Sequence, residues 1–444
     1  MKFILITSIG LLILFSSCTS IRTTAVIPES QPILKSIQAE TKTGFPAKEV
    51  EDPQGILTLE KAIQLALMQN PRLAVYSLEI RARDADALQA SLFPNPEIEI
   101  ETENFAGSGV YRGIDATETT ISLGQLLELS GKREKRTKVA VFESDLAAWD
   151  YEALKLQVYT SVVRNYIQVL ALQEKIELDK ELLNISEKLV ESVKKRVQSG
   201  GLSPAETARA NVVVSNAEIT LQRTERQLLA TRSLLASTWN GKGLFATIQG
   251  SLEANRKIPE KDIIKQKLDQ APELARWSVE MERRRSSLEL AEAMAVPDPT
   301  ISLAYRRINE SKDNALVAGL SIPLPFFDRN QGNVQKKQIR VKQGVWEKKT
   351  VRNNLNTRLE SLYPNAEALA AEISALRQTA IPQAEKAFVI ISESYQRGKF
   401  QLIDVLDAQR TLFEARRRLV DSLLDFKMTI TELERLIGRD LQSL

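Results

Sequence analysis

Residues 196–210 read RVQSGGLSPAETARA, and residues 394–408 read SYQRGKFQLIDVLDA. Both segments follow a long helical pattern, and each contains a glycine, Gly200 in the first and Gly398 in the second. A large apolar residue stands two positions after each glycine, an acidic residue six positions after it and an alanine ten positions after it. We interpret the two segments as one local structure that occurs twice, a turn between two long helices.

Three further pairs of segments support an internal duplication, because they occur in the same order at nearly the same spacing. NPRLA at 70–74 matches APELA at 271–275, FPNP at 93–96 matches VPDP at 296–299, and Ser-Leu at 122–123 matches Ser-Ile at 321–322. These pairs are 199 to 203 positions apart, and the two glycines are 198 positions apart. We therefore predict two repeats, at residues 56–240 and 260–444, joined by a linker or equatorial segment at residues 241–259.

The composition excludes several classes of function. The chain has no histidine and a single cysteine, Cys18, so a Ser-His-Asp triad, a Cys-His dyad or a zinc site of histidine and cysteine cannot form within it. No glycine-rich phosphate loop is present. Lys and Arg total 60 and Asp and Glu 57, which gives no basic excess for nucleic acid. We expect no enzymatic activity, no cofactor, no resident metal site and no nucleic-acid partner.

The N-terminus has the pattern of a secretion signal. Lys2 precedes an apolar run at residues 3–15, which is shorter than the roughly 20 residues that a membrane-spanning helix needs. Cys18 follows directly, at the position where a lipoprotein signal peptidase would cut. We predict a signal peptide at residues 1–17, lipidation of Cys18, and an N-terminal leash at residues 18–55. The alternative is an ordinary signal peptide followed by an incidental cysteine.

Two short regions have the period of a β-strand. Residues 97–103 alternate strictly, with Ile98 and Ile100 on one face and four glutamates on the other: Glu97, Glu99, Glu101 and Glu103. Apolar residues also alternate between residues 301 and 322. We predict one β-hairpin at about residues 95–127 and a second at about residues 298–325, each between helical blocks.

The rest of the pattern is helical. Residues 132–198 contain neither proline nor glycine, which predicts one helix roughly 100 Å long. Near the C-terminus, apolar residues recur every seven positions, as in a coiled-coil seam: Val405, Leu412, Leu419, Phe426 and Leu433. The predicted fold is therefore mainly α with a small β part.

Four strands cannot form a membrane-spanning barrel alone. A sheet in lipid must close so that every strand edge is paired, and about eight strands or more are needed to do so. The strands either pack on helices in a soluble protein or are pooled from several chains. Burying the glutamate face against a core would cost several kcal/mol for each unpaired carboxylate. Pooling is the better interpretation, because the glutamates would then face water.

These features together resemble the TolC-type outer-membrane efflux channels, also called outer membrane factors. The stretch at residues 118–133, ETTISLGQLLELSGKR, with the acidic strand before it, is similar to their heavy-metal (cobalt–zinc–cadmium) branch. The resemblance implies a homotrimer that pools 12 strands into one transmembrane barrel and continues as a long coiled-coil helical barrel in the periplasm. It also implies two helical tips per chain, at residues 196–206 and 394–404, which we call the first tip and the second tip.

The resemblance further implies gate residues at the periplasmic end. The tyrosine and two aspartates of the family pattern match Tyr395, Asp404 and Asp407, and Glu206 is the matching acid of the first tip. Three copies would form rings of carboxylates that attract cations. One departure concerns the closing ion pair, because Phe400 stands where the best-known members have a basic residue. The alternative is that the two aspartates only begin a solvated helix.

The exposed turns of the two tips are the expected docking site of a periplasmic membrane-fusion adaptor. Gly200 and Gly398 form the turns, while Leu202 and Phe400 supply matched apolar side chains. The other implied partners are an inner-membrane pump of the resistance-nodulation-division type and outer-membrane lipid.

The predicted function is a passive outer-membrane exit duct of a tripartite efflux system for heavy-metal cations. One alternative is an outer-membrane duct for type I protein secretion or multidrug efflux, which shares the fold and differs in partners. A second is a coiled-coil structural lipoprotein without a pore, although such a protein has no use for the alternating hairpins.

Lipidation of Cys18 can be tested by intact-mass analysis of the processed protein. The parent protein is expected to carry the mass of the acyl groups, and the Cys18→Ala variant is expected to lack it. Because the predicted barrel also anchors the chain, this variant should keep part of its activity. Two processed proteins without any acyl mass would contradict the prediction.

Overall fold

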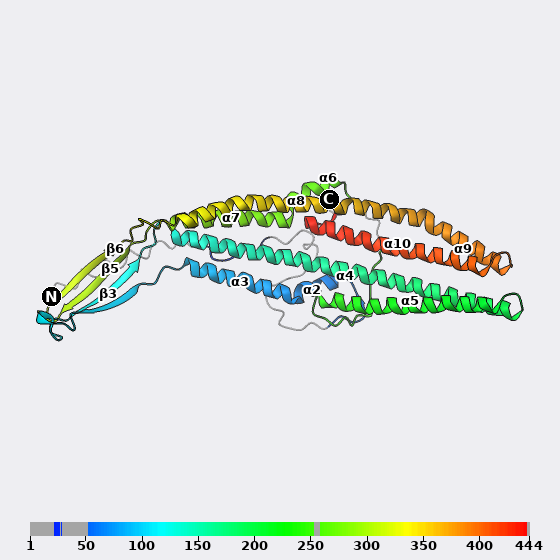
Figure 1. The fold of residues 1–444 in the computed structure, drawn as a ribbon, viewed down its shortest axis with the longest axis horizontal. Helices are drawn as coiled ribbons and strands as arrows, with labels where there is room; N and C mark the ends of the chain where they lie inside the picture. Colours follow the sequence, from blue (N-terminus) through cyan, green and yellow to red (C-terminus); the bar gives the residue numbers. More distant parts are fainter. Residues whose placement is uncertain (1–21, 27, 29–51, 253–257, 442–444) are drawn as a thin grey trace. The chain divides into compact units, whose positions relative to one another are not determined.

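The computed structural model describes residues 22–26, 28, 52–252 and 258–441, most of which are helical (Figure 1). The predicted signal peptide at residues 1–17, Cys18 and most of the predicted leash at residues 18–55 lie outside the described residues.

The same order of elements occurs twice along the chain. The first series is α2 (Leu59–Gln69), α3 (Pro71–Ser91), β2 (Glu97–Glu103), β3 (Glu118–Leu126), α4 (Lys132–Gln198) and α5 (Pro204–Ser237). The second is α6 (Lys261–Lys267), α7 (Pro272–Ala293), β5 (Thr300–Ile308), β6 (Asn314–Ser321), α8 (Gln331–Ala375), α9 (Ile381–Gln396) and α10 (Leu402–Ile437). Shorter elements complete the fold: β1 (Ile56–Leu57), η1 (Gly109–Tyr111), β4 (Thr247–Ile248), η2 (Leu268–Gln270) and η3 (Leu376–Ala380).

In space the chain divides into two compact units, and neither of them is a single repeat. The strand unit contains the described residues up to Pro28, together with Leu78–Trp149 and Arg276–Lys349. The helical unit contains the described parts of residues 29–77, 150–275 and 350–444. Each unit therefore combines segments from both halves of the sequence.

The strand unit contains one antiparallel sheet with the strand order β2-β3-β5-β6. Each predicted hairpin supplies two neighbouring strands, and the β3–β5 pair joins the two halves of the sequence. Among the described residues, β2 and β6 each pair on one side only, so both outer edges of the sheet carry unpaired backbone groups.

Helix α4 is 67 residues long and has the bounds that the absence of proline and glycine predicts. It ends at Gln198, and the turn that follows contains Gly200, whose φ of 75° is unfavourable for residues with a Cβ atom. The corresponding part of the second half is interrupted by a π-helical turn, η3, just before Pro382. Because proline has no backbone N–H, it cannot continue the α-helical bonding of this segment, and the wider turn accommodates the missing bond.

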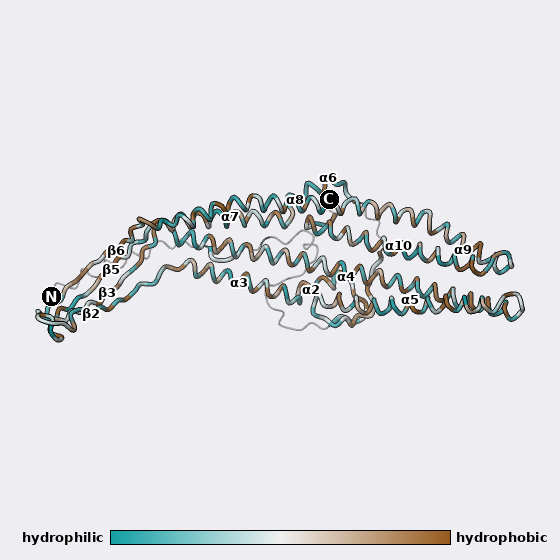
Figure 2. The backbone as a smooth tube through the Cα atoms, in the orientation of Figure 1, coloured by the Kyte–Doolittle hydropathy of each residue, from teal (hydrophilic) through white to brown (hydrophobic). Residues whose placement is uncertain are grey.

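The main hydrophobic core of the helical unit lies around α4 and α10, while α9 packs into a separate apolar cluster at the tips. The side chains of Trp239, Phe245, Leu57 and Leu433 are almost fully buried. Along α10, the predicted seam positions Val405, Leu412, Phe426 and Leu433 are buried, and Leu419 packs at the edge of the core. In Figure 2, hydrophobic and hydrophilic colours alternate along the helices, as expected when each helix buries one face.

Ion pairs also join the helices of the helical unit. The guanidinium of Arg416 on α10 lies 2.9 Å from a carboxylate oxygen of Glu181 on α4 and 2.6 Å from one of Glu385 on α9. Arg417, the next residue of α10, pairs with Asp179 of α4, whose other carboxylate oxygen accepts a hydrogen bond from Thr224 of α5. The α4–α5 and α9–α10 hairpins are thus bonded to each other along their length.

A short segment before the first helix is bound to the strand unit. The backbone N–H of Ala25 donates to Asp84 of α3, and that of Val26 donates to Asp145 of α4, each over 2.7 Å. Arg22 pairs with the same Asp145. This part of the predicted leash is therefore held in place by side chains that satisfy its backbone.

A parallel two-residue ladder between β1 and β4 was not apparent from the sequence. Its anchor is Tyr166 of α4, whose hydroxyl hydrogen-bonds to the carbonyl oxygens of Leu57 (2.9 Å) and Gln249 (2.5 Å). Burial raises the pKa of Tyr166 to about 12. Folding therefore favours the protonated phenol over the ionised one.

Tyr166 should make stability depend on pH in the alkaline range. Its contribution is complete below pH 10, the ordinary pKa of tyrosine, and is lost as pH rises towards the folded pKa of about 12. Tyr166→Phe should cost about 1–3 kcal/mol at neutral pH, because the carbonyl oxygens of Leu57 and Gln249 lose the one hydroxyl donor that they share. It should also flatten the decline above pH 10, as measured by urea unfolding in detergent. An equally steep decline in both proteins would contradict this assignment.

Candidate functional site

The four-stranded sheet has one apolar face. The register aligns Ile98, Leu123, Leu303 and Ala318 across the four strands. The larger apolar side chains of this face are 44% to 80% exposed: Ile98, Ile100, Ile121, Leu123, Ile301, Leu303, Tyr305, Leu316 and Leu320. Such a continuous exposed apolar surface marks contact with lipid or with another protein.

The opposite face of the sheet is polar and acidic. Along β2, the glutamates alternate with Ile98 and Ile100, and they lie in register with small or polar residues of β3. This face therefore carries five carboxylates: Glu97, Glu99, Glu101, Glu103 and Glu118. All of β2 is exposed in the single chain. The structure therefore brings the four predicted lumen glutamates together on one face.

Arg306 is the charged residue of this polar face that the sequence reading missed. Its guanidinium lies 3.3 Å from a carboxylate oxygen of Glu118 and 3.7 Å from one of Glu103, and its Nε donates to the Thr120 hydroxyl over 3.0 Å. It neutralises part of the acidic charge near the β2–β3 loop. The alternation along β5 could have predicted this position, because Arg306 follows Tyr305 and so lies on the opposite face.

The two tips are the same turn in atomic detail. In the first tip, Gly201 N–H donates to Arg196 O (2.8 Å) and Gly200 N–H donates to Val197 O (3.0 Å). In the second tip, Lys399 N–H donates to Ser394 O and Gly398 N–H donates to Tyr395 O, both over 2.9 Å. This is the Schellman motif, and φ is 75° at Gly200 and 79° at Gly398.

The apolar residues expected to dock a partner are accessible after these turns. Phe400 is 42% exposed, and Leu202 is half-buried against the apolar cluster of the tips. Figure 1 shows the two turns at the ends of the α4–α5 and α9–α10 hairpins.

The acidic residues of the tips occupy the first turn of each second helix. Glu206 lies in α5 and is 3.4 Å from Arg209. Asp404 accepts the backbone N–H of Gln401 (2.8 Å) in a capping box at the start of α10. Asp407 is exposed and pairs with Arg410 over 2.6 Å. Asp404 thus has a capping role in helix α10, while Asp407 faces solvent.

Tyr395 lies inside the tips rather than on their surface. It is 2% exposed and belongs to an apolar cluster with Val193, Leu402 and Val405. Burial raises the pKa of Tyr395, and the neighbouring Arg196 lowers it. In this conformation its ring packs between helices of its own chain.

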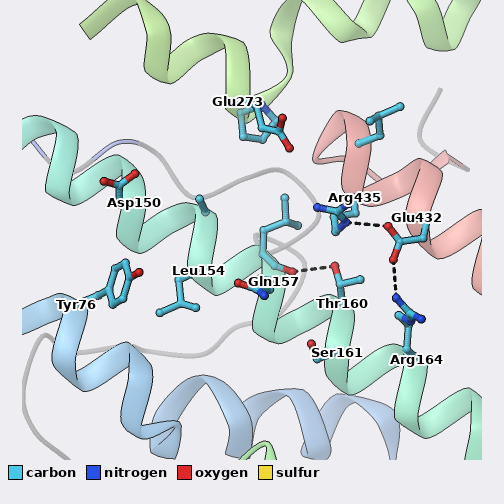
Figure 3. A pocket seen from close by; sticks show the side chains of 14 residues that line it. Tyr76, Asp150, Leu154, Gln157, Thr160, Ser161, Arg164, Glu273, Glu432 and Arg435 are labelled. Atoms are coloured by element: carbon cyan, nitrogen blue, oxygen red, sulfur yellow. Dashed lines mark hydrogen bonds and ion pairs between the residues drawn. The ribbon is translucent and has the colours of Figure 1, made fainter. Parts of the chain in front are cut away.

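A cavity of about 580 Å³ lies elsewhere in the helical unit, between α4, α10 and the start of α7 (Figure 3). Its charged side chains are largely paired: Glu432 lies 2.9 Å from both Arg164 and Arg435, and Glu273 lies 3.5 Å from Arg358. Over the described ranges there is no cluster of three or more acidic, histidine or cysteine side chains suited to a metal ion.

None of the described helices is both long and apolar enough to cross a lipid bilayer.

The structure thus combines a sheet that has one apolar and one acidic face with long helical hairpins that end in exposed turns. The profile of the family described as outer membrane efflux protein matches residues 62–241 and 263–439 of this chain. The chain therefore belongs to the outer membrane efflux protein family, whose members are channels.

Several characterised proteins are similar over most of the chain. The cobalt-zinc-cadmium resistance protein CzcC of Cupriavidus metallidurans is 30% identical, over 90% of this chain and 95% of its own length. The nickel-cobalt-cadmium resistance protein NccC of Alcaligenes xylosoxydans xylosoxydans is 23% identical, over 66% of this chain and 67% of its own. The resemblance to the heavy-metal branch is thereby confirmed.

Solved structures share the fold. The outer membrane protein VceC of Vibrio cholerae has a TM-score of 0.73 at 20% identity, covering 86% of this chain and 96% of that one. A structure of CusC has a TM-score of 0.71 at 17% identity, covering 94% of this chain and 100% of that one.

The aspartates of the second tip either form a gate or only begin helix α10, and block of the channel by multivalent cations distinguishes these two roles. If Asp404 and Asp407 form the gate, divalent or trivalent cations on the periplasmic side should block conductance, and Asp404→Ala combined with Asp407→Ala should relieve the block. Asp407→Asn alone leaves the capping box intact and should relieve it in part. A double variant that is blocked as strongly as the parent would leave the aspartates with only a helix-starting role.

Proposed function

We propose that this chain is the outer-membrane exit duct of a tripartite efflux system. Three copies pool their four-stranded sheets into one 12-stranded barrel, with the apolar face towards lipid and the acidic face towards the lumen. The observation that carries this proposal is the register of the sheet, which places apolar side chains of all four strands on one face and the carboxylates of β2 and β3 on the other. A structural coiled-coil lipoprotein offers no reason for that separation.

The proposed cargo is heavy-metal cations, which pass through the duct as substrate and are not bound as resident ions. Two similarities support this choice, since the relatives CzcC and NccC are named for resistance to cobalt, zinc, nickel and cadmium. The acidic lumen face supports it as well, because clustered carboxylates raise the local concentration of cations. Energy and selectivity reside in an inner-membrane pump of the resistance-nodulation-division type.

The remaining assignments follow from the same proposal. The chain is a duplicated unit with repeats at residues 56–240 and 260–444, an interpretation supported by the matching order of elements and the matching turns. Cys18 anchors it by lipid, and its helices reach into the periplasm.

The two tips dock a membrane-fusion adaptor through Leu202 and Phe400. Charged substitutions there should abolish export while the trimer remains in the membrane.

Reversal potentials of the purified protein in planar bilayers test the duct and its lumen face. The parent channel should prefer cations, and changing Glu97, Glu99, Glu101 and Glu103 together to Gln should reduce that preference severalfold. Glu310→Gln, in the β5–β6 loop, is a control that removes a carboxylate outside the strands. An unchanged preference in the quadruple variant would place the acidic face outside the pore.

The cargo is tested in the protein's own host. Deleting the gene should lower tolerance to cobalt, zinc or cadmium, and the parent chain should restore it. Unchanged metal tolerance together with sensitivity to organic compounds would favour the multidrug alternative instead.

A further inference from the structure

The two tips share the backbone geometry of their turns but differ in several side chains, and two adjacent positions matter here. The spacing of 198 makes Ser394 the counterpart of Arg196, and Tyr395 the counterpart of Val197. The first tip therefore has a long cation, Arg196, two residues before the end of its helix, where the second tip has a serine. The second tip has an aromatic ring, Tyr395, one residue before the end of its helix, where the first tip has a valine. The structure brings these two residues into contact.

Arg196 contacts the second tip in two ways. Its guanidinium carbon lies 4.6 Å from the centre of the Tyr395 ring, within the range of a cation–π interaction. Its Nη1 donates to the carbonyl oxygen of Tyr395 over 3.0 Å. That oxygen also accepts Gly398 N–H, the bond that closes the second turn. The cation thus lies at the C-terminal end of helix α9, where a positive charge is stabilising.

The backbone of Arg196 holds the first turn at the same time. Its carbonyl oxygen accepts Gly201 N–H (2.8 Å) and the Ser199 hydroxyl (3.0 Å). One residue therefore closes the first turn through its backbone and supports the second through its side chain. The neighbouring cations do not have this geometry, since Lys195 pairs with Glu191 of its own helix, and Arg397 lies 3.8 Å from Glu393 of its own helix.

Behind Tyr395 lies a cavity of about 170 Å³, lined by both apolar and polar residues of α4, α9 and α10. Three buried polar atoms that line it have no hydrogen-bond partner among the described residues: Ser392 Oγ, Tyr395 Oη and Gln409 Oε1. The Gln409 amide donates instead to the Ser186 hydroxyl over 2.9 Å. A buried polar atom without a partner is destabilising, and the three atoms together with a cavity of this size suit bound water. Tyr395 is therefore packed less tightly on this side than on the side of Arg196.

We propose that Arg196 is a gating residue that ties the second tip to the first within each chain, in place of the basic residue that Phe400 replaces. The cavity behind Tyr395 gives the ring room to move once Arg196 releases it, so loss of this contact separates the tips and opens the periplasmic end. The gating part of this inference rests on the proposed function, while the contact between the tips does not.

Hydrogen–deuterium exchange and conductance of the purified trimer test the two parts separately. Arg196→Gln should speed amide exchange about tenfold in residues 196–202 and 394–400, since it removes one cation–π contact and one hydrogen bond. It should also raise the conductance of the closed channel several times. Lys195→Gln removes the same charge from the adjacent position and should change neither. Arg196→Lys keeps the charge without the planar guanidinium and should fall between the two.

Each result then has one meaning. Faster exchange with higher conductance supports the inference in full. Faster exchange in Arg196→Gln, in a protein that never conducts in any variant, supports the contact between the tips and contradicts the duct. Unchanged exchange in both tips, or equal effects of Arg196→Gln and Lys195→Gln, overturns the inference.

Discussion

The structure depends on one constraint, the need to pair every backbone N–H and C=O group of a sheet that enters lipid. Four strands per chain leave the outer edges of β2 and β6 unpaired within the described residues. Copies of the chain can satisfy these edges by pairing β6 of one with β2 of the next. In the proposed barrel, closure gives the two faces of the sheet opposite surroundings, lipid on one side and water on the other. The strict alternation of Glu and Ile along β2 fits both.

In the helical unit the constraint is different, because two long helical hairpins must stay packed in register. Its apolar core and the ion pairs of Arg416 and Arg417 join the two hairpins along their length. At the tips the core narrows to a small cluster around Tyr395, and a single cation, Arg196, reaches from one turn to the other. A contact of this strength suits an element that must open, because it can be broken at a cost of a few kcal/mol.

Much of this arrangement could be predicted from the sequence because it depends on local rules. Helix α4 has the predicted bounds since no proline or glycine interrupts residues 132–198, and the strands lie where alternation indicated them. The contacts between distant residues could not be predicted. Arg196 and Tyr395 meet only because two hairpins pack together, and the two-residue β1–β4 ladder is too short to have a period. The capping role of Asp404 depends on the side chain of Gln401, a residue type rarely found at this position.

The most direct test of the central claim is the accessibility of the two sheet faces in the membrane. Nitroxide labels can be placed on single cysteines that replace Ile98, Glu99, Leu303 or Ala304, since Cys18 is the only native cysteine. Labels at 98 and 303 should relax faster with lipid-soluble oxygen, and labels at 99 and 304 with a water-soluble nickel complex. Equal accessibility of all four positions to the nickel complex would contradict a pooled membrane barrel.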